Sequence, residues 1–242
     1  DVNPLHTDNF EEVSFGPILY GAKKLGMHIH TRYEVSNNAG QDICDIVNNE
    51  GFDFLLVGSG ISMSDSPDDI AATRYRTSFY NRYFKRFKAP ESWFYPGALL
   101  KDKTKMFIAR SNCDVGVFIN RNFVKATNTL VVISSEEDLF LLDYTRTLLK
   151  ATHGSVGIVA KMSTTTPGHD QILKELWDFV SSIPQTQLLP DKDLTPGLFN
   201  SYNFMLIGYN TWNDVSEHRK EALQKMPSTL ILNKNKRSSS DN

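Results

Sequence analysis

The sequence lacks several features that would point to a particular chemistry or location. No apolar run approaches the roughly 20 residues that a membrane-spanning helix requires, and no signal peptide is present. The only two cysteines, Cys44 and Cys113, match no metal spacing and are typical of reduced core thiols. With a net charge of −2, no overall field attracts nucleic acid or an anionic membrane. Hydrolase, Walker and zinc-enzyme motifs are absent, so we expect a soluble protein that is not an enzyme.

A repeated pair of apolar segments is the most informative feature that is present. Phe52–Gly58 (FDFLLVG) returns as Tyr202–Gly208 (YNFMLIG), and Val117–Asn122 (VFINRN) is matched by Leu230–Asn235 (LILNKN). The connection between the two segments is longer in the first copy. Such a repeat predicts a duplicated α/β unit. The chain begins at Asp1 without a methionine, so we expect it to be part of a longer protein.

Hydrophobic periodicity predicts the elements of both copies. The second copy has five strands separated by helices, the pattern of a doubly wound parallel sheet. These strands are Thr129–Ile133, Val156–Met162, Gln185–Leu189, Phe204–Ile207 and Thr229–Leu232, with helices expected at Glu136–Lys150 and Asp214–Gln224 among others. The first copy shows only its later elements. These are strands at His28–Val35, Phe52–Val57 and Val115–Ile119, with a helix before each.

The predicted fold class is therefore α/β, with two doubly wound, Rossmann-type parallel-sheet lobes. Residues 1–126 form the first lobe, which is incomplete at its N-terminus and carries an insertion at 61–97. Residues 127–233 form the second lobe, and residues 234–242 are expected to be a polar, disordered tail. Val115–Ile119 and Thr229–Leu232 are both apolar, and an open edge strand invites uncontrolled pairing. We expect these two strands to pair within one chain and form a pseudo-dimeric monomer.

Four blocks of sequence, in this order, resemble a known family. They are Gln41–Ile46 (QDICDI), Phe52–Val57, Asn112–Asn122 (NCDVGVFINRN) and Thr129–Leu139 (TLVVISSEEDL). The blocks are similar to the cytosolic C-terminal region of cation/proton antiporters, of the plant cation/H+ exchanger type and their fungal potassium/proton counterparts. That region consists of tandem universal-stress-protein-like units with strand order 3-2-1-4-5.

The resemblance implies a cytosolic regulatory domain of a monovalent cation (potassium)/proton antiporter that serves cation and pH homeostasis. Its partner would be its own membrane transport domain, whose ion-exchanging residues are not in this chain. The full-length protein would be a dimer, located in a membrane such as that of the Golgi. The alternative is a nucleotide-binding protein of the universal stress type.

Ligands of open parallel sheets bind beyond the carboxyl ends of strands where the strand order reverses. In the first copy this predicts a ligand-binding site at Gly58, Ser59 and Gly60, and in the second copy at Ser134 and Ser135. Nucleotide-binding stress proteins carry a Gly-x2-Gly-x9-Gly-Ser/Thr motif here, and this sequence departs from it. We therefore expect no cofactor, with a nucleotide as the alternative.

An acidic run, Glu136, Glu137 and Asp138, starts a predicted helix. Negative charge at a helix N-terminus is favoured by the helix dipole, which explains the run without any function. The functional alternative is a cation or pH sensor.

The insertion interleaves basic and aromatic residues. Aromatic residues recur every fourth position from Tyr75 to Phe87, whereas Arg82, Lys85 and Arg86 lie away from that helical face. A helix that packs its aromatic face on the sheet explains this pattern. The alternative is contact of the basic residues with a membrane surface or a partner. Nucleic acid is not expected, because the rest of the chain is not basic.

His28 and His30 share one face of a predicted strand, but no third ligand of suitable spacing stands nearby. The sequence therefore predicts no metal site.

Overall fold

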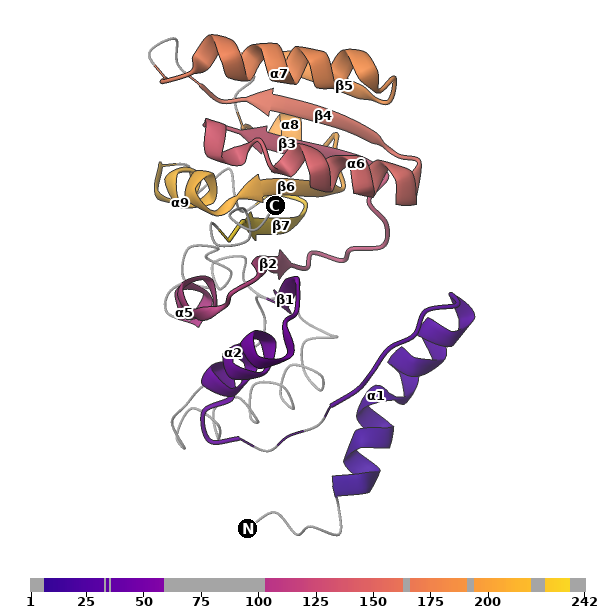
Figure 1. Cartoon of the computed structure of the whole chain (residues 1–242). Coiled ribbons are helices and arrows are strands. Elements are labelled where there is room, and N and C mark those ends of the chain that lie inside the picture. The colour runs from indigo at the N-terminus through magenta and orange to yellow at the C-terminus, as the bar shows by residue number, and fades with distance from the viewer. Residues whose placement is uncertain are drawn as a thin grey trace. The chain divides into compact units, whose positions relative to one another are not determined.

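The computed structural model describes residues 7–32, 34, 36–58, 103–162, 166–190, 194–218 and 225–235 (Figure 1). It divides into two compact units, residues 1–39 and 40–242, and each is described by itself. The boundary between residues 126 and 127 that was predicted from the sequence stays a prediction. None of the helices in the described ranges is long and apolar enough to cross a membrane.

The N-terminal unit consists of helix α1 (Thr7–Lys24) and an extended segment. The helix continues through Pro17, although a proline in a helix interior usually kinks or breaks the helix. Residues 27–32 form no strand, so the expected strand at His28–Val35 is wrong for that part of the segment. An isolated strand is not stable without a partner to complete its hydrogen bonds. His28 and His30 are both exposed.

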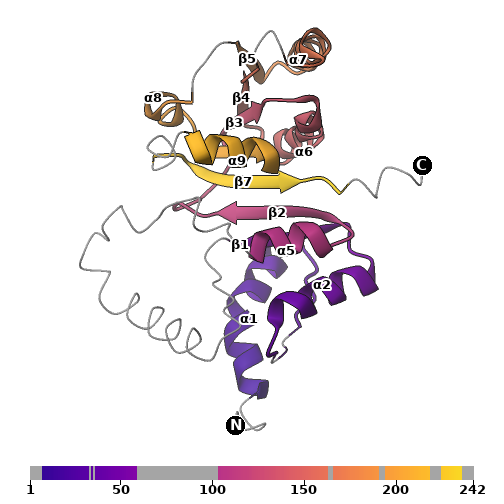
Figure 2. The ribbon, with the colours of Figure 1, turned by 90° about the vertical axis from the view of Figure 1, so that its left-hand side faces the viewer.

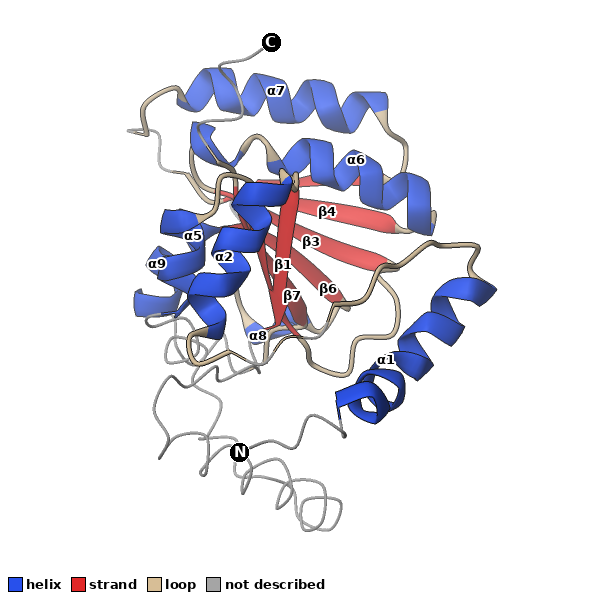
Figure 3. Cartoon of the chain, turned by 60° about the horizontal axis from the view of Figure 1, so that its bottom comes forward, coloured by secondary structure: helices blue, strands red, loops and turns tan. Residues whose placement is uncertain are grey.

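A seven-stranded sheet forms the centre of the second unit (Figure 3). Its order is β1-β2-β7-β6-β3-β4-β5, and every neighbouring pair is parallel except β2 and β7. The strands are β1 (Phe54–Gly58), β2 (Asp114–Ile119), β3 (Asn128–Ile133), β4 (Ser155–Ala160), β5 (Thr186–Pro190), β6 (Phe204–Gly208) and β7 (Ser228–Asn233). This mostly parallel α/β architecture confirms the predicted fold class.

Helices cover both faces of the sheet (Figure 2). On one face, α6 (Leu141–Thr152) and α7 (His169–Ser182) bury Leu141, Ile172 and Leu176 against β3, β4 and β6. The other face carries α8 (Pro196–Phe199) and α9 (Tyr209–His218), whose Phe199 and Trp212 pack on β3, β6 and β7. On this face α2 (Ala39–Glu50) and α5 (Lys103–Arg110) pack against β2.

The second lobe, β3 to β7, has its strands in the spatial order β5-β4-β3-β6-β7. Counted along the lobe, this is the order 3-2-1-4-5 that the family resemblance implied. Of the first lobe, the described residues show α2, β1, α5 and β2. These elements repeat the last part of the second lobe, because β1 pairs with β2 as β6 pairs with β7.

The two lobes join through the antiparallel pair β2–β7, in which Val117 lies opposite Ile231. This confirms the predicted pairing within one chain. The match between the copies is shifted by one residue, however. Asp114 lies opposite Phe54, and Ser228 occupies the same position opposite Phe204. The counterpart of Val117 is therefore Ile231 and not Leu230, since a one-residue slip would turn the strand's apolar face away from its core.

A symmetric pair of hydrogen bonds closes both ends of this junction. Asn235 N donates to Asp114 Oδ1, and Arg121 N donates to Ser228 Oγ, each at 2.8 Å. In each bond, the first residue of one strand accepts from a backbone N–H just beyond the end of the other strand. Tyr144 of α6 adds a bond from its hydroxyl to Asp114 Oδ2 at 2.8 Å. The lobes are thus held by side chains as well as by the strand ladder.

Two predicted helices differ from those observed. The helix expected at Glu136–Lys150 is divided into a 3-10 turn, η3 (Glu136–Asp138), and α6. Within η3 the Asp138 side chain turns back and accepts from the backbone N–H groups of Ser134 and Ser135, as in a helix-capping box. Helix α9 begins at Tyr209, directly after β6, and not at the expected Asp214. The insertion at 61–97 lies outside the described residues, as do Arg82, Lys85 and Arg86.

The two cysteines are buried and free. Burial is the main cause that raises the pKa of both the Cys44 and the Cys113 thiol. Both side chains therefore stay protonated at neutral pH and behave as small apolar core groups.

Candidate functional site

The strand order reverses between β3 and β6, and this defines the crevice in which an open α/β sheet binds ligands. From β3 the chain continues through α6, on one face of the sheet, to β4. From β6 it continues through α9, on the other face, to β7. The two connections diverge at the carboxyl ends of β3 and β6. The residues that follow Ile133 and Gly208 therefore form the crevice.

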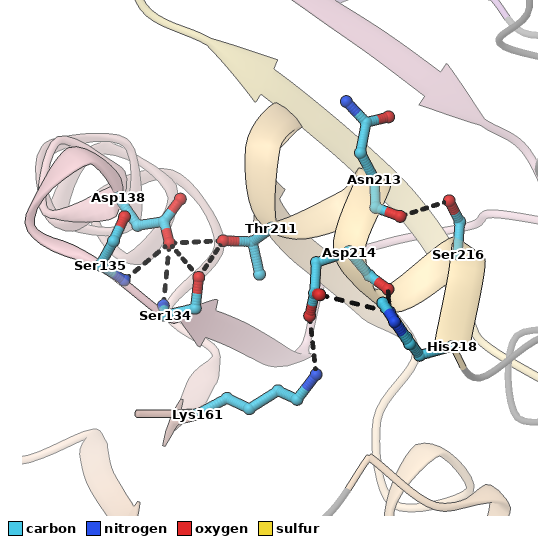
Figure 4. Close-up of polar contacts among 9 residues, drawn as sticks. All are labelled: Ser134, Ser135, Asp138, Lys161, Thr211, Asn213, Asp214, Ser216 and His218. Carbon is cyan, nitrogen blue, oxygen red and sulfur yellow. Dashed lines mark hydrogen bonds and ion pairs between the residues drawn. The ribbon is translucent and has the colours of Figure 1, made fainter. Parts of the chain in front are cut away.

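The buried carboxylate of Asp138 fills this crevice (Figure 4). Its Oδ2 atom accepts from Ser134 N at 2.8 Å, Ser134 Oγ at 3.1 Å and Ser135 N at 3.3 Å. Thr211 of α9 donates to the same oxygen through Oγ1 at 2.6 Å, and the Ser134 and Thr211 hydroxyls also contact each other. The donors on both sides of the crevice, which are backbone N–H groups and a hydroxyl after β3 and a hydroxyl on α9, thus bind the Asp138 carboxylate.

Gly208, the last residue of β6, lies against the other carboxylate oxygen. A Cβ atom at this position would collide with Asp138 Oδ1. The close approach of the Asp138 side chain to the backbone of β6 therefore requires glycine here. In the first lobe, a Cβ at the matching Gly58 would meet no atom of the described residues within 4 Å.

The other two acidic residues of the run face outward. Glu136 and Glu137 are exposed, and Asn210 Nδ2 donates to Glu137 Oε2 at 2.8 Å. Glu137 and Asp138 also line a shallow cavity of about 230 Å³ at the carboxyl ends of β6 and β7, together with Asn210 and Lys234. Within the described ranges, no three His, Cys, Asp or Glu side chains lie close enough to hold a metal ion.

A second polar group on α9 has no catalytic geometry (Figure 4). Asp214 pairs with Lys161 Nζ at 3.2 Å, and His218 Nδ1 lies 2.8 Å from the Asp214 carbonyl oxygen. Ser216 Oγ donates to the carbonyl of Asn213 at 2.9 Å and is not directed at the imidazole. A nucleophile must donate to its base to be activated. This group is therefore a surface ion pair and a set of local helix contacts.

The structure separates the residues that the sequence proposed as ligand-binding. Ser134 and Ser135 lie in the crevice, where both backbone N–H groups and the Ser134 hydroxyl donate to Asp138 Oδ2. β1 runs antiparallel to β3. Its carboxyl end, where Gly58 lies, is therefore at the opposite ends of the strands from the carboxyl ends of β3 and β6. Ser59 and Gly60 lie outside the described residues. The two proposed sites are therefore distinct.

Sequence reasoning missed Thr211 and Asn210, which complete the crevice from the side of α9. Both precede Asp214, where the predicted helix begins, and follow Ile207, where the predicted strand ends. The sequence contained one indication of an earlier helix start, namely the glycine that ends the repeated strand. A buried strand that ends in glycine at a crevice is followed directly by a helix N-terminus in many α/β folds.

Comparisons with known proteins support the fold. The chain matches no protein-family model and no curated protein sequence. It is similar to the solved structure of a universal stress protein from Archaeoglobus fulgidus, with a TM-score of 0.52 and 11% sequence identity over 98% of this chain and 81% of that one. A putative universal stress protein from Pseudomonas aeruginosa is 10% identical over 93% of this chain and 79% of that one, with a TM-score of 0.46. The first likeness establishes a universal-stress-protein-like fold and nothing beyond the fold.

Proposed function

We propose that this chain is a non-catalytic regulatory domain of a monovalent cation/proton antiporter, located on the cytosolic face of a membrane. The support is the position of the four sequence blocks that resemble such proteins. They fall on α2, β1 and β2 of the first lobe and on the segment from β3 to η3 of the second lobe. A resemblance that includes elements of both lobes favours a tandem domain over a single stress-protein unit.

The partner in this proposal is the transport domain of the same protein, and ions would cross the membrane there. The pairing of β2 with β7 already gives one chain the two-lobed sheet that a single-lobe protein would need a dimer to build. Dimerisation of the full-length protein is then assigned to its membrane part. Glu136 and Glu137 are the exposed carboxylates that a cation or pH response would use.

The alternative, nucleotide binding in the crevice between β3 and β6, is opposed by Asp138. A phosphate held there would need the backbone N–H groups and hydroxyls that Asp138 Oδ2 accepts. It would also stand beside a buried carboxylate, and two like charges at such a distance repel each other. Calorimetric titration of the chain with ATP and AMP tests this directly. A saturable heat at millimolar nucleotide would restore the alternative.

The antiporter proposal is tested on the natural protein with an antibody raised against this chain. We expect the antibody to detect a species well above 27.4 kDa, the mass of the chain alone. It should sediment with membranes, resist alkaline carbonate extraction and be released by detergent. A 27.4 kDa species found in the soluble fraction would contradict the proposal. The density of the membrane fraction that carries the protein identifies the compartment.

A further inference from the structure

Strand β1 has the sequence of a central strand but lies at an edge. Its sequence FLLVG matches FMLIG of β6 closely. All five residues of β6 are buried between β3 and β7, whereas β1 pairs only with β2 among the described residues. The contrast is largest at one matched pair, since Leu206 is 2% exposed and Leu56 is 58% exposed.

The second lobe shows what covers a strand of this kind. β3 pairs in parallel with the free side of β6, from Thr129 opposite Phe204 to Val132 opposite Ile207. Helix α6, which follows β3, then buries Leu141 and Leu142 in the same core cluster as Leu206. β3 thus covers the edge of β6 that faces away from β7, and α6 covers one face of β6.

The opposite edge of the sheet has the features of a strand that stays free. β5 carries Gln187, which is exposed, and ends at Pro190. Proline and charged residues protect native edges, because proline cannot donate a backbone N–H to a further strand and a charge opposes its burial. Residues 54–57 of β1 include no proline, no charge and no polar side chain. Among the described residues, β1 is therefore an edge that no strand pairs with and that carries none of these protecting side chains.

We propose that the free edge of β1 is an interaction surface for a partner polypeptide that supplies one apolar strand followed by an amphipathic helix. The strand would run parallel to β1 and carry branched aliphatic side chains on both faces, as β3 does beside β6. The helix would cover Leu56. Strand addition to an exposed edge gives affinity through the backbone and specificity through alternate side chains. This inference does not depend on the proposed antiporter function.

The test measures binding of a fluorescently labelled peptide with the sequence of residues 126–152, which spans β3, η3 and α6, to the whole chain. Fluorescence anisotropy should show saturable binding, and a scrambled peptide of the same composition should not bind. Leu56→Lys should weaken binding by about tenfold or more, because it removes apolar contact area and places a charge at the edge. Gln187→Lys, the matched change on the β5 edge, should leave binding unchanged.

Leu56 is exposed, so its replacement should not prevent folding, and the circular dichroism melt of each variant checks this. Absence of peptide binding, or binding that Leu56→Lys leaves unchanged, would overturn the proposal. Light scattering provides a further arm. If the chain is a dimer that Leu56→Lys converts into a monomer, the edge belongs to a second copy, and the proposed partner is wrong.

Discussion

Gly208 and Gly58 end matched strands of the two lobes and stand in different surroundings. Gly208 is packed against the Asp138 carboxylate, and α9 begins at the next residue. Gly58 is exposed, and no atom of the part of the chain that the structure describes lies within 4 Å of where its Cβ would be. The group that fills the crevice comes from η3, after β3, and the described part of the first lobe has no counterpart of either element. Duplication of a strand therefore did not duplicate the site at its end.

The largest expected effect comes from breaking the junction that relates the two lobes. Ile231 lies opposite Val117 and is 1% exposed. Ile231→Asp places a charge in that core, and we expect it to lower the free energy of unfolding by about 4 kcal/mol or more. Ile231→Ala, which leaves only a cavity, should cost about 2–5 kcal/mol. Both values are measured by denaturant unfolding followed by circular dichroism.

Val124 provides the matched control, because it is 92% exposed and Val124→Asp should leave stability nearly unchanged. Light scattering then separates two roles of β7. If Ile231→Asp retained the wild-type melting temperature but halved the mass of the particle, the strand would be a contact between chains, and the pairing of lobes within one chain would be wrong.

The comparison of the two glycines is sharpened by making the same change in both lobes. Gly208→Ala forces the Asp138 side chain out of position, and overpacking of this kind costs about 1–3 kcal/mol. Gly58→Ala meets open space and should change stability by less than about 0.5 kcal/mol. Thermal melts of the two variants give the difference. Equal losses would show that the two strand ends are equally constrained, contrary to the structure.

Much of the fold could be predicted from the sequence, because the strands that carry it are continuous apolar runs. Val131 and Ile207, for example, belong to runs that are buried on both faces, and such runs indicate a parallel sheet. The crevice could be predicted only in part. Asp138 was expected at the start of a helix, and the sequence does not show that its side chain turns inward to accept from Thr211, which is distant in the chain.

Sequence comparison also could not find which residues of β2 and β7 are equivalent. The two Asn-plus-basic endings align Val117 with Leu230, whereas the pairing within each lobe, β1 with β2 and β6 with β7, makes Val117 equivalent to Ile231. Asp114 and Ser228 occupy equivalent positions and accept equivalent hydrogen bonds, although one is a carboxylate and the other a hydroxyl. Register in a sheet depends on contacts with the neighbouring strand, and these exist only after folding.

The smallest expected effect tests one side chain at the junction. Tyr144 donates to Asp114 Oδ2, and Tyr144→Phe leaves that oxygen without this donor, at a cost of about 1 kcal/mol at neutral pH.

Burial, followed by the hydrogen bond to Asp114, raises the pKa of the Tyr144 hydroxyl well above its ordinary value. A raised pKa stabilises the folded protein fully below about pH 10, the pKa of a tyrosine in an unfolded chain, and this contribution is lost as the pH rises further. The stability difference between wild type and Tyr144→Phe should therefore shrink above about pH 10 in denaturant titrations. Tyr20→Phe, which removes the hydroxyl of an exposed tyrosine, is the control at neutral pH and should change stability little. A Tyr144→Phe difference that stayed constant to pH 11 would contradict this role.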